Sequence, residues 1–94
     1  MPEQPLLPPV VYVPCVAEVA MAADAQLEYR RTKDGRSALL AYSALDRLRR
    51  GMGDTQPWAV MPTTTLEKVW EADGFDVVLL DIEVPEEHRR EGQA

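Results

Sequence analysis

The sequence has few of the residues that usually carry chemistry, with one cysteine and one histidine among 94 residues. Cys15 has no partner for an internal disulfide bond, which indicates a reducing compartment. His88 alone cannot build the ligand set of a zinc site, and its charged terminal segment offers a general base no fixed position. No G-x-G-x-x-G or Walker pattern is present. We therefore expect no catalytic residue, no bound metal and no cofactor.

Positive charge and long apolar runs are also scarce. Ten Lys and Arg residues stand against sixteen Asp and Glu, which gives a net charge of −6. Nucleic acid is not an expected partner, because phosphate binding needs a cationic surface. No apolar run reaches the ~18–20 residues that span a bilayer, and no positively charged segment precedes the first apolar residues. We expect a cytoplasmic protein without a membrane partner. Five arginines are interpreted as solvated side chains: Arg30, Arg31, Arg47, Arg49 and Arg50.

What the sequence does contain is typical of one small globular domain. Hydrophobic residues make up 46% of the chain and charged residues 28%. Most of the eight prolines precede residue 15, so we expect a Pro-rich extended leader over residues 1–9. A single α/β domain is expected over residues 10–84, followed by a charged tail over residues 85–94.

Local patterns predict strands and helices in the order β-β-β-α-β-α-β. Asp34-Gly35 supplies the positive φ angles of a tight hairpin turn between two alternating segments. Polar residues before apolar helical patterns are interpreted as N-caps, and glycines after them as helix ends. The expected caps are Ser43 and Thr64, and the expected stops are Gly51 or Gly53 and then Gly74. The predicted strands are 10–13, 27–31, 38–42, 58–61 and 75–82, and the predicted helices are 43–52 and 64–73.

This order favours an α+β fold built on a single mixed sheet. Right-handed crossovers would make the last three strands parallel and would place both helices on one face of the sheet. The strand over 75–82 is nevertheless apolar on both faces, as in the interior of a parallel sheet. The second face then needs a cover. It could come from the Pro-rich leader, from residues 15–24 (a loop or one helical turn), or from a partner chain.

The uncovered face leads to the functional hypothesis. We expect a non-catalytic protein-interaction or regulatory module that self-associates or docks on a protein partner. The expected partner-contact residues are Tyr12, Trp58, Val78, Leu80 and Ile82. The alternative is a small ligand-binding domain or enzyme with its pocket at the carboxyl ends of the parallel strands. That pocket would lie near Ser43, Thr63, Thr64 and Glu83.

Several stretches of the chain, taken together, follow the pattern of a known family. They are Val11–Pro14, the segment Arg36–Ser43 that enters a Leu45-x-x-Leu48 helix, Trp58–Pro62 before the Leu66 helix, and Asp76–Asp81. Over residues 10–84 the sequence resembles the N-terminal domain of the SseB family and the small standalone SseB-like proteins of actinobacteria. The resemblance implies a compact cytoplasmic α/β domain without an assigned catalytic site, and it supplies no catalytic residue.

Overall fold

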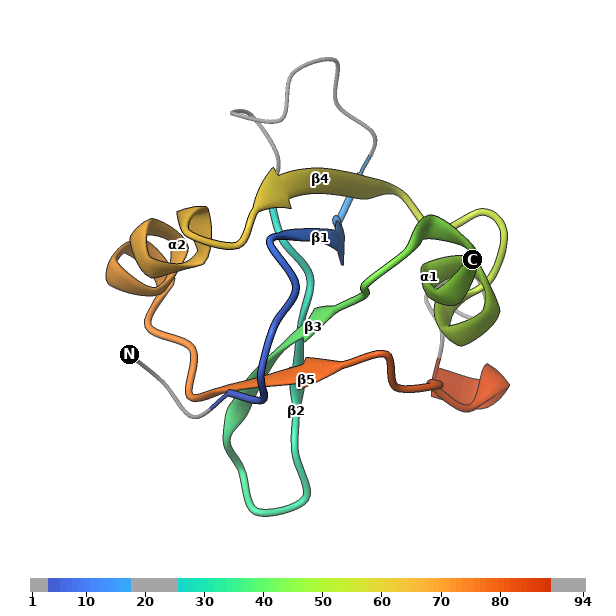
Figure 1. Cartoon of the computed structure of the whole chain (residues 1–94). Coiled ribbons are helices and arrows are strands. Elements are labelled where there is room, and N and C mark those ends of the chain that lie inside the picture. Colours follow the sequence, from blue (N-terminus) through green and yellow to red (C-terminus); the bar gives the residue numbers. More distant parts are fainter. Residues whose placement is uncertain (1–3, 18–25, 89–94) are drawn as a thin grey trace.

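Two small β-sheets form the centre of the protein, with a helix on either side of them (Figure 1). The computed structural model describes residues 4–17 and 26–88. The predicted element order and the α+β class are confirmed. Most of the segment 15–24, the start of the leader and the end of the charged tail lie outside the described residues. The elements are β1 (Val10–Pro14), β2 (Tyr29–Arg31), β3 (Ser37–Ala41), α1 (Leu45–Met52), β4 (Trp58–Pro62), α2 (Thr65–Asp73), β5 (Val77–Leu80) and the short 3-10 helix η2 (Glu86–His88).

The predicted hairpin of β2 and β3 forms, but of the Asp34-Gly35 pair only Gly35 adopts the expected positive φ. Gly35 has a φ of 86°, in the region that residues with a Cβ atom rarely adopt. The Thr32 N–H donates to the Arg36 C=O over 2.8 Å and closes the turn. Beyond the turn the strands pair antiparallel, with Tyr29 opposite Leu39. The predicted hairpin is therefore confirmed.

The helices end at the expected glycines but begin without the predicted side-chain caps. Gly53 follows α1 with a φ of 103°, and Gly74 follows α2 with a left-handed φ of 71°. Ser43 does not cap α1, because its hydroxyl donates to the Asp81 carboxylate instead. Thr64 is the N-cap of α2, yet its side chain makes no capping hydrogen bond.

β4 lies in a different sheet from β3 and β5, so the expectation of a single sheet is wrong. β1 and β4 pair antiparallel, whereas β2, β3 and β5 form a second sheet in which β3 and β5 run parallel as expected. β4 buries only alternate residues, which is typical of an antiparallel strand with one solvated face. β5 is consequently an edge strand and not an interior one. Bridges between Tyr12 and Tyr42 and between Cys15 and Leu27 connect the two sheets.

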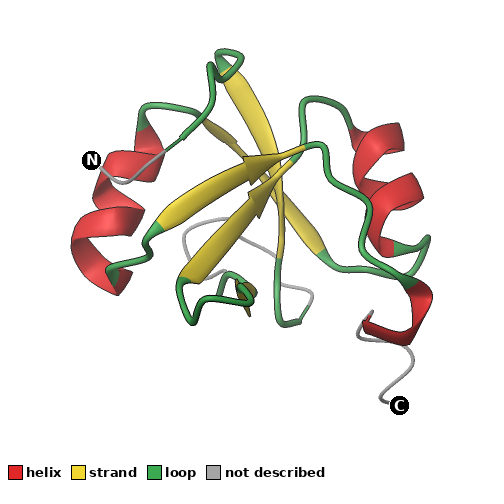
Figure 2. Cartoon of the chain, turned by 90° about the horizontal axis from the view of Figure 1, so that it is seen from below, coloured by secondary structure: helices red, strands yellow, loops and turns green. Residues whose placement is uncertain are grey.

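The helices cover opposite faces of β3, which corrects the expectation that both lie on one face (Figure 2). The crossover rule does not apply to β3, α1 and β4, because β3 and β4 belong to different sheets. Leu39 clusters with Leu66 of α2, while its neighbour Leu40 points the other way and clusters with Leu48 of α1. The chain therefore shields both faces of its central strand with its own residues.

The two clusters on these faces make up the hydrophobic core. The α2-side core comprises Val11, Val13, Cys15, Leu39, Ala41, Ala59, Met61, Leu66, Phe75 and Val78. The α1-side core comprises Leu40, Tyr42, Leu48, Met52 and Val84.

Candidate functional site

The predicted partner-contact residues do not form one surface. Val78 is 1% exposed and belongs to the α2-side core, so a partner cannot reach it. Leu80 packs against the α2-side core and Ile82 against the α1-side core, both partly buried. The chain's own residues pack on both faces of β5, so the expectation of a face without any cover is wrong, although Leu79 and Ile82 stay partly exposed. Tyr12 lies on β1, where it also packs against the α1-side core, and Trp58 lies on β4.

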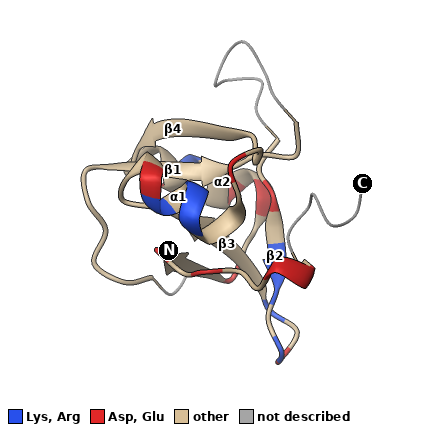
Figure 3. Cartoon of the chain, turned by 90° about the vertical axis from the view of Figure 1, so that its right-hand side faces the viewer, with Lys and Arg blue, Asp and Glu red and all other residues tan. Residues whose placement is uncertain are grey.

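Tyr12 and Trp58 meet on the outer face of the β1–β4 sheet, with ring centroids 5.6 Å apart. Side chains alternate between the faces of a strand, and Val60 lies opposite Tyr12 on the same face. The exposed fractions are 43% for Val10, 38% for Trp58 and 41% for Val60. Figure 3 shows β1 and β4 without charged residues. We call the accessible part of this surface the β1–β4 outer face, and it consists of Val10, Tyr12, Trp58, Val60 and Pro62. Tyr12 is partly buried against the α1-side core, and Pro14, opposite Trp58 on the same face, is fully buried.

β4 also has a strand edge that no other described strand pairs with. The hydrogen bond of 2.8 Å from the Cys15 N–H to the Pro57 C=O fixes the phase of the β1–β4 ladder. In an antiparallel ladder, alternate residues point their backbone N–H and C=O groups at the partner strand, and here these are the odd-numbered residues of β4. The backbone N–H and C=O groups of Trp58 and Val60 therefore point toward the open edge.

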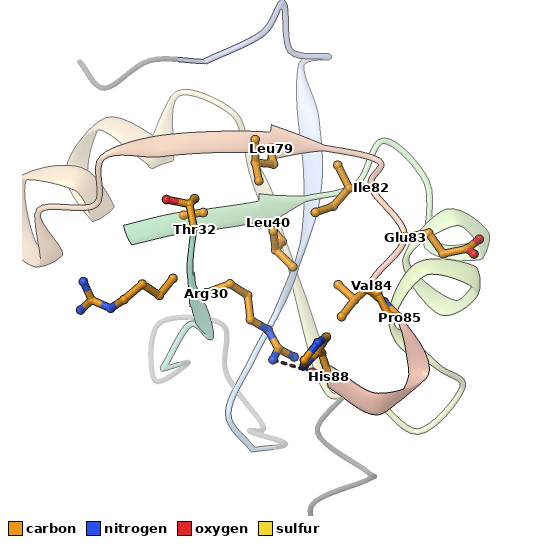
Figure 4. Close-up of a pocket in the computed structure, with 11 residues that line it drawn as sticks. Arg30, Thr32, Leu40, Leu79, Ile82, Glu83, Val84, Pro85 and His88 are labelled. Atoms are coloured by element: carbon orange, nitrogen blue, oxygen red, sulfur yellow. Dashed lines mark hydrogen bonds between the residues drawn. The ribbon is translucent and has the colours of Figure 1, made fainter. Parts of the chain in front are cut away.

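A cavity of about 400 Å³ opens on the α1 side of the second sheet. Its floor is apolar and includes Leu40, Leu79 and Ile82. Arg30 of β2 reaches across to η2, where its Nη1 donates to the His88 C=O over 2.7 Å (Figure 4). We call this cavity the Arg30 cavity. It combines an apolar floor with a guanidinium group at its wall, a combination common in small-molecule sites.

Ser43 and Asp81 form a junction between the start of α1 and the end of β5. Asp81 accepts from the Ser43 N–H (2.8 Å), the Ser43 hydroxyl (2.7 Å) and the Arg47 Nη1 (2.8 Å). Burial acts to raise the pKa of Asp81, but these hydrogen bonds and the Arg47 charge outweigh it and lower the pKa overall. A direct serine–aspartate bond without an imidazole between them is a structural link and not an activated nucleophile.

The residues of the alternative pocket are not brought together. Ser43 is bound to Asp81, whereas Thr63 donates its hydroxyl to the Pro8 C=O at the far end of β4. Glu83 lines the Arg30 cavity, and Figure 4 shows its carboxylate turned away from the other lining side chains. Sequence reasoning missed the role of Arg30, because its contact joins positions 58 residues apart.

Cys15 and His88 occupy structural positions. Burial, and secondarily the negative charge of Glu28, raises the pKa of the Cys15 thiol, which opposes formation of the reactive thiolate. His88 contributes its backbone C=O to Arg30. Within residues 4–17 and 26–88, no group of three or more His, Cys, Asp or Glu side chains is placed to hold a metal ion. No helix in the described part of the chain has the length and apolar character needed to cross a membrane.

Comparison with known proteins agrees with the fold. The family described as SseB protein N-terminal domain matches residues 5–89, a range that contains every helix and strand described above. No curated protein and no solved structure matches the chain. The chain therefore belongs to the SseB N-terminal domain family.

Proposed function

We propose that the protein is a non-catalytic interaction module that self-associates by pairing β4 of one copy with β4 of a second copy. The β1–β4 outer face is the observation that supports this proposal best, because it is apolar throughout and adjoins the open edge of β4. Unpaired backbone groups along an edge are a ready template for another strand. Exposed apolar side chains beside such an edge add buried area when the second strand arrives.

Antiparallel pairing about a two-fold axis at Val60 fits the backbone of β4. The Val60 N–H of each copy would donate to the Val60 C=O of the other, since both groups point to the open edge. The Trp58 N–H would donate to the Pro62 C=O of the second copy. Pro62 has no N–H to return, so the paired segment stays short and its register is restricted.

This contact would form without bringing like charges together. The net charge of −6 opposes association in general. β1 and β4 contain no Lys, Arg, Asp or Glu, so the repulsion acts at long range, where salt screens it. We therefore expect self-association to strengthen modestly when salt is raised to ~0.5 M, whereas an interface held by ion pairs would weaken.

The test is sedimentation equilibrium of the chain from the low micromolar range to about 500 μM. The variant Val60→Lys places a charge at the proposed axis, as natural edge strands do to block pairing. We expect it to weaken the dimer at least ~10-fold, a change of about 1.4 kcal/mol. Leu6→Lys is the matched control, because Leu6 is 97% exposed and lies outside the β1–β4 outer face.

Two results would contradict the proposal. One is a wild-type chain that stays monomeric at the highest concentration. The other is a Val60→Lys variant that associates like the wild type. Thermal unfolding of both variants shows whether a change in association reflects the contact or a loss of fold, since surface substitutions alter stability by only about 0.5 kcal/mol.

In this proposal the protein acts in a bacterial cytoplasm, where a lone thiol stays reduced. Neither nucleic acid nor a membrane is a partner. Salt-sensitive retention of the chain on DNA or RNA would contradict that part, because phosphate contacts give binding its steep salt dependence.

A further inference from the structure

The Arg30 cavity is separate from the surface proposed for self-association. Its lining comes from β2, β3, β5 and the residues that lead into η2, and none comes from β1 or β4. Its volume of about 400 Å³ falls within the range of small-molecule sites. Leu79 and Ile82 are only partly buried, so apolar surface of the floor remains open to a ligand.

The guanidinium group of Arg30 retains hydrogen-bonding capacity. Its Nη1 donates to the His88 C=O over 2.7 Å, and its Nη2 approaches Glu28 Oε2 at a long 3.5 Å. Its Nε is buried and has no acceptor among the described residues. An arginine has five N–H donors in a planar fork, so these contacts leave donors for an anion. A buried N–H donor without an acceptor is unfavourable, and a bound anion that accepts from the Arg30 guanidinium group would relieve that cost.

The charges around the cavity restrict the anion to a single negative charge. Arg31 also lines the cavity, but its Nη1 donates to the Gly35 C=O of the hairpin turn over 2.7 Å, and Figure 4 shows the Glu83 carboxylate turned away. Glu28 already balances part of the Arg30 charge. A monoanion suits this balance, whereas a phosphate dianion would leave negative charge that Arg30 does not compensate, close to Glu28.

We propose that the Arg30 cavity binds a small monocarboxylic acid with a compact aliphatic body. The carboxylate accepts hydrogen bonds from the Arg30 guanidinium, a pairing whose planar geometries match. The aliphatic body lies on the partly exposed Leu79 and Ile82, which removes apolar surface from water. The Arg30 charge therefore sets the orientation of the bound acid, and contact with the apolar floor contributes to its affinity.

The test is an NMR titration of the ¹⁵N-labelled chain with hexanoate, and with hexan-1-ol and hexylamine as probes of equal length. We expect hexanoate to shift the amides of residues 30–32 and 79–84 in a saturable manner. We expect it to bind at least ~10-fold more tightly than hexan-1-ol, because the alcohol lacks the charge-assisted hydrogen bonds. Hexylamine should bind more weakly than the alcohol, since its cation would face the Arg30 guanidinium group.

Arg30→Gln should reduce the hexanoate affinity ~10-fold or more and leave the hexan-1-ol affinity unchanged. Arg36→Gln is the matched control, because Arg36 lies in the hairpin turn and outside the cavity lining, and it should bind hexanoate like the wild type. If Arg30→Gln fails to fold, Ile82→Ala replaces it. That variant shortens the floor and should weaken hexanoate and hexan-1-ol alike.

The proposal is overturned if hexanoate gives no saturable shifts at the cavity amides. It is equally overturned if hexan-1-ol or hexylamine binds as well as hexanoate, or if Arg30→Gln retains full affinity. The Val60→Lys variant should bind hexanoate like the wild type, so failure of the self-association proposal and failure of this one are separate results.

Discussion

Gly51 lies at the contact between α1 and the chain that follows β5, where there is no room for a side chain. A Cβ atom at this position would lie 2.5 Å from the Ile82 backbone oxygen and 2.9 Å from Tyr42 Cε2. Neither atom is free to move, since the Tyr42 hydroxyl donates to that same oxygen over 2.8 Å. The Val84 N–H also donates to the Gly51 C=O over 2.8 Å. Gly51 is therefore a packing residue inside α1, while Gly53 ends the helix.

We expect Gly51→Ala to lower the free energy of unfolding by about 1–3 kcal/mol, the usual cost of overpacking. In an open helical position the same change would stabilise by about 0.5–1 kcal/mol, so the sign of the effect is diagnostic. Urea denaturation measures it. Lys68→Ala, at an exposed position of α2, is the control and should change the value by less than ~0.5 kcal/mol. A neutral or stabilising Gly51→Ala would contradict the close approach.

The packing of residues 82–84 against α1 also explains why the sequence did not predict the role of Arg30. The Asp34-Gly35 turn depends on neighbours in the chain, so local pattern is enough to predict it. Arg30 depends on His88, which reaches it only because residues 82–84 pack on α1. From the sequence, Arg30 is therefore interpreted as a solvated strand arginine. No local pattern distinguishes such an arginine from one that binds the His88 C=O at the wall of a cavity.

Among the elements, β5 and α1 are joined by the Asp81 junction, and this junction predicts a pH dependence. The pKa of Asp81 is lowered in the folded state, so the ionised form contributes stability above the unfolded pKa of about 3.9. That contribution is lost as the pH falls through the lower folded pKa. We expect Asp81→Asn to cost about 1–2 kcal/mol at pH 7, with a smaller cost at pH 3. Asparagine tolerates the positive φ of 57° at this position, so backbone strain does not confound the comparison.

Urea denaturation of the wild type and Asp81→Asn at both pH values checks this expectation. Asp54→Asn, at an exposed position after α1, is the control for removing one negative charge. A difference between wild type and Asp81→Asn that stays constant from pH 7 to pH 3 would show that ionisation of this carboxyl group does not stabilise the fold.

The helices and strands were predictable as elements, but not all of their pairings were. Alternating polar and apolar residues, or a short apolar run, predict each strand. The helical spacing of apolar residues and a glycine at the end predict each helix. The partner of β4 is different, because β1 is distant in sequence and both strands are short. Alternating burial in Trp58–Pro62 was the available signal, since a parallel interior strand is apolar on both faces. Once β4 is assigned to β1, the crossover argument for helices on one face no longer applies.

At the scale of the whole molecule, β3 contributes fully buried side chains to both cores. Leu39 and Leu40 point to opposite faces and join the α2-side and α1-side cores respectively. Backbone bonds of 2.8 Å between Tyr12 and Tyr42, in both directions, also tie the two sheets together. A small domain has a free energy of unfolding of only about 5–15 kcal/mol, so neither core is large enough to persist without the other. We infer that the molecule unfolds as one cooperative unit.

This inference predicts that a cavity in either core destabilises the whole fold. Leu39→Ala and Leu48→Ala each remove a fully buried side chain, one from each core, and each should cost about 2–4 kcal/mol. Urea denaturation followed by tryptophan fluorescence and by far-ultraviolet circular dichroism should give coincident transitions for both variants, as two-state unfolding requires. Leu6→Ala is the control, because its 97% exposed side chain belongs to neither core. If Leu48→Ala instead melts in two steps, with helical signal lost before the fluorescence changes, the α1-side core is an independent unit and β3 does not couple the two.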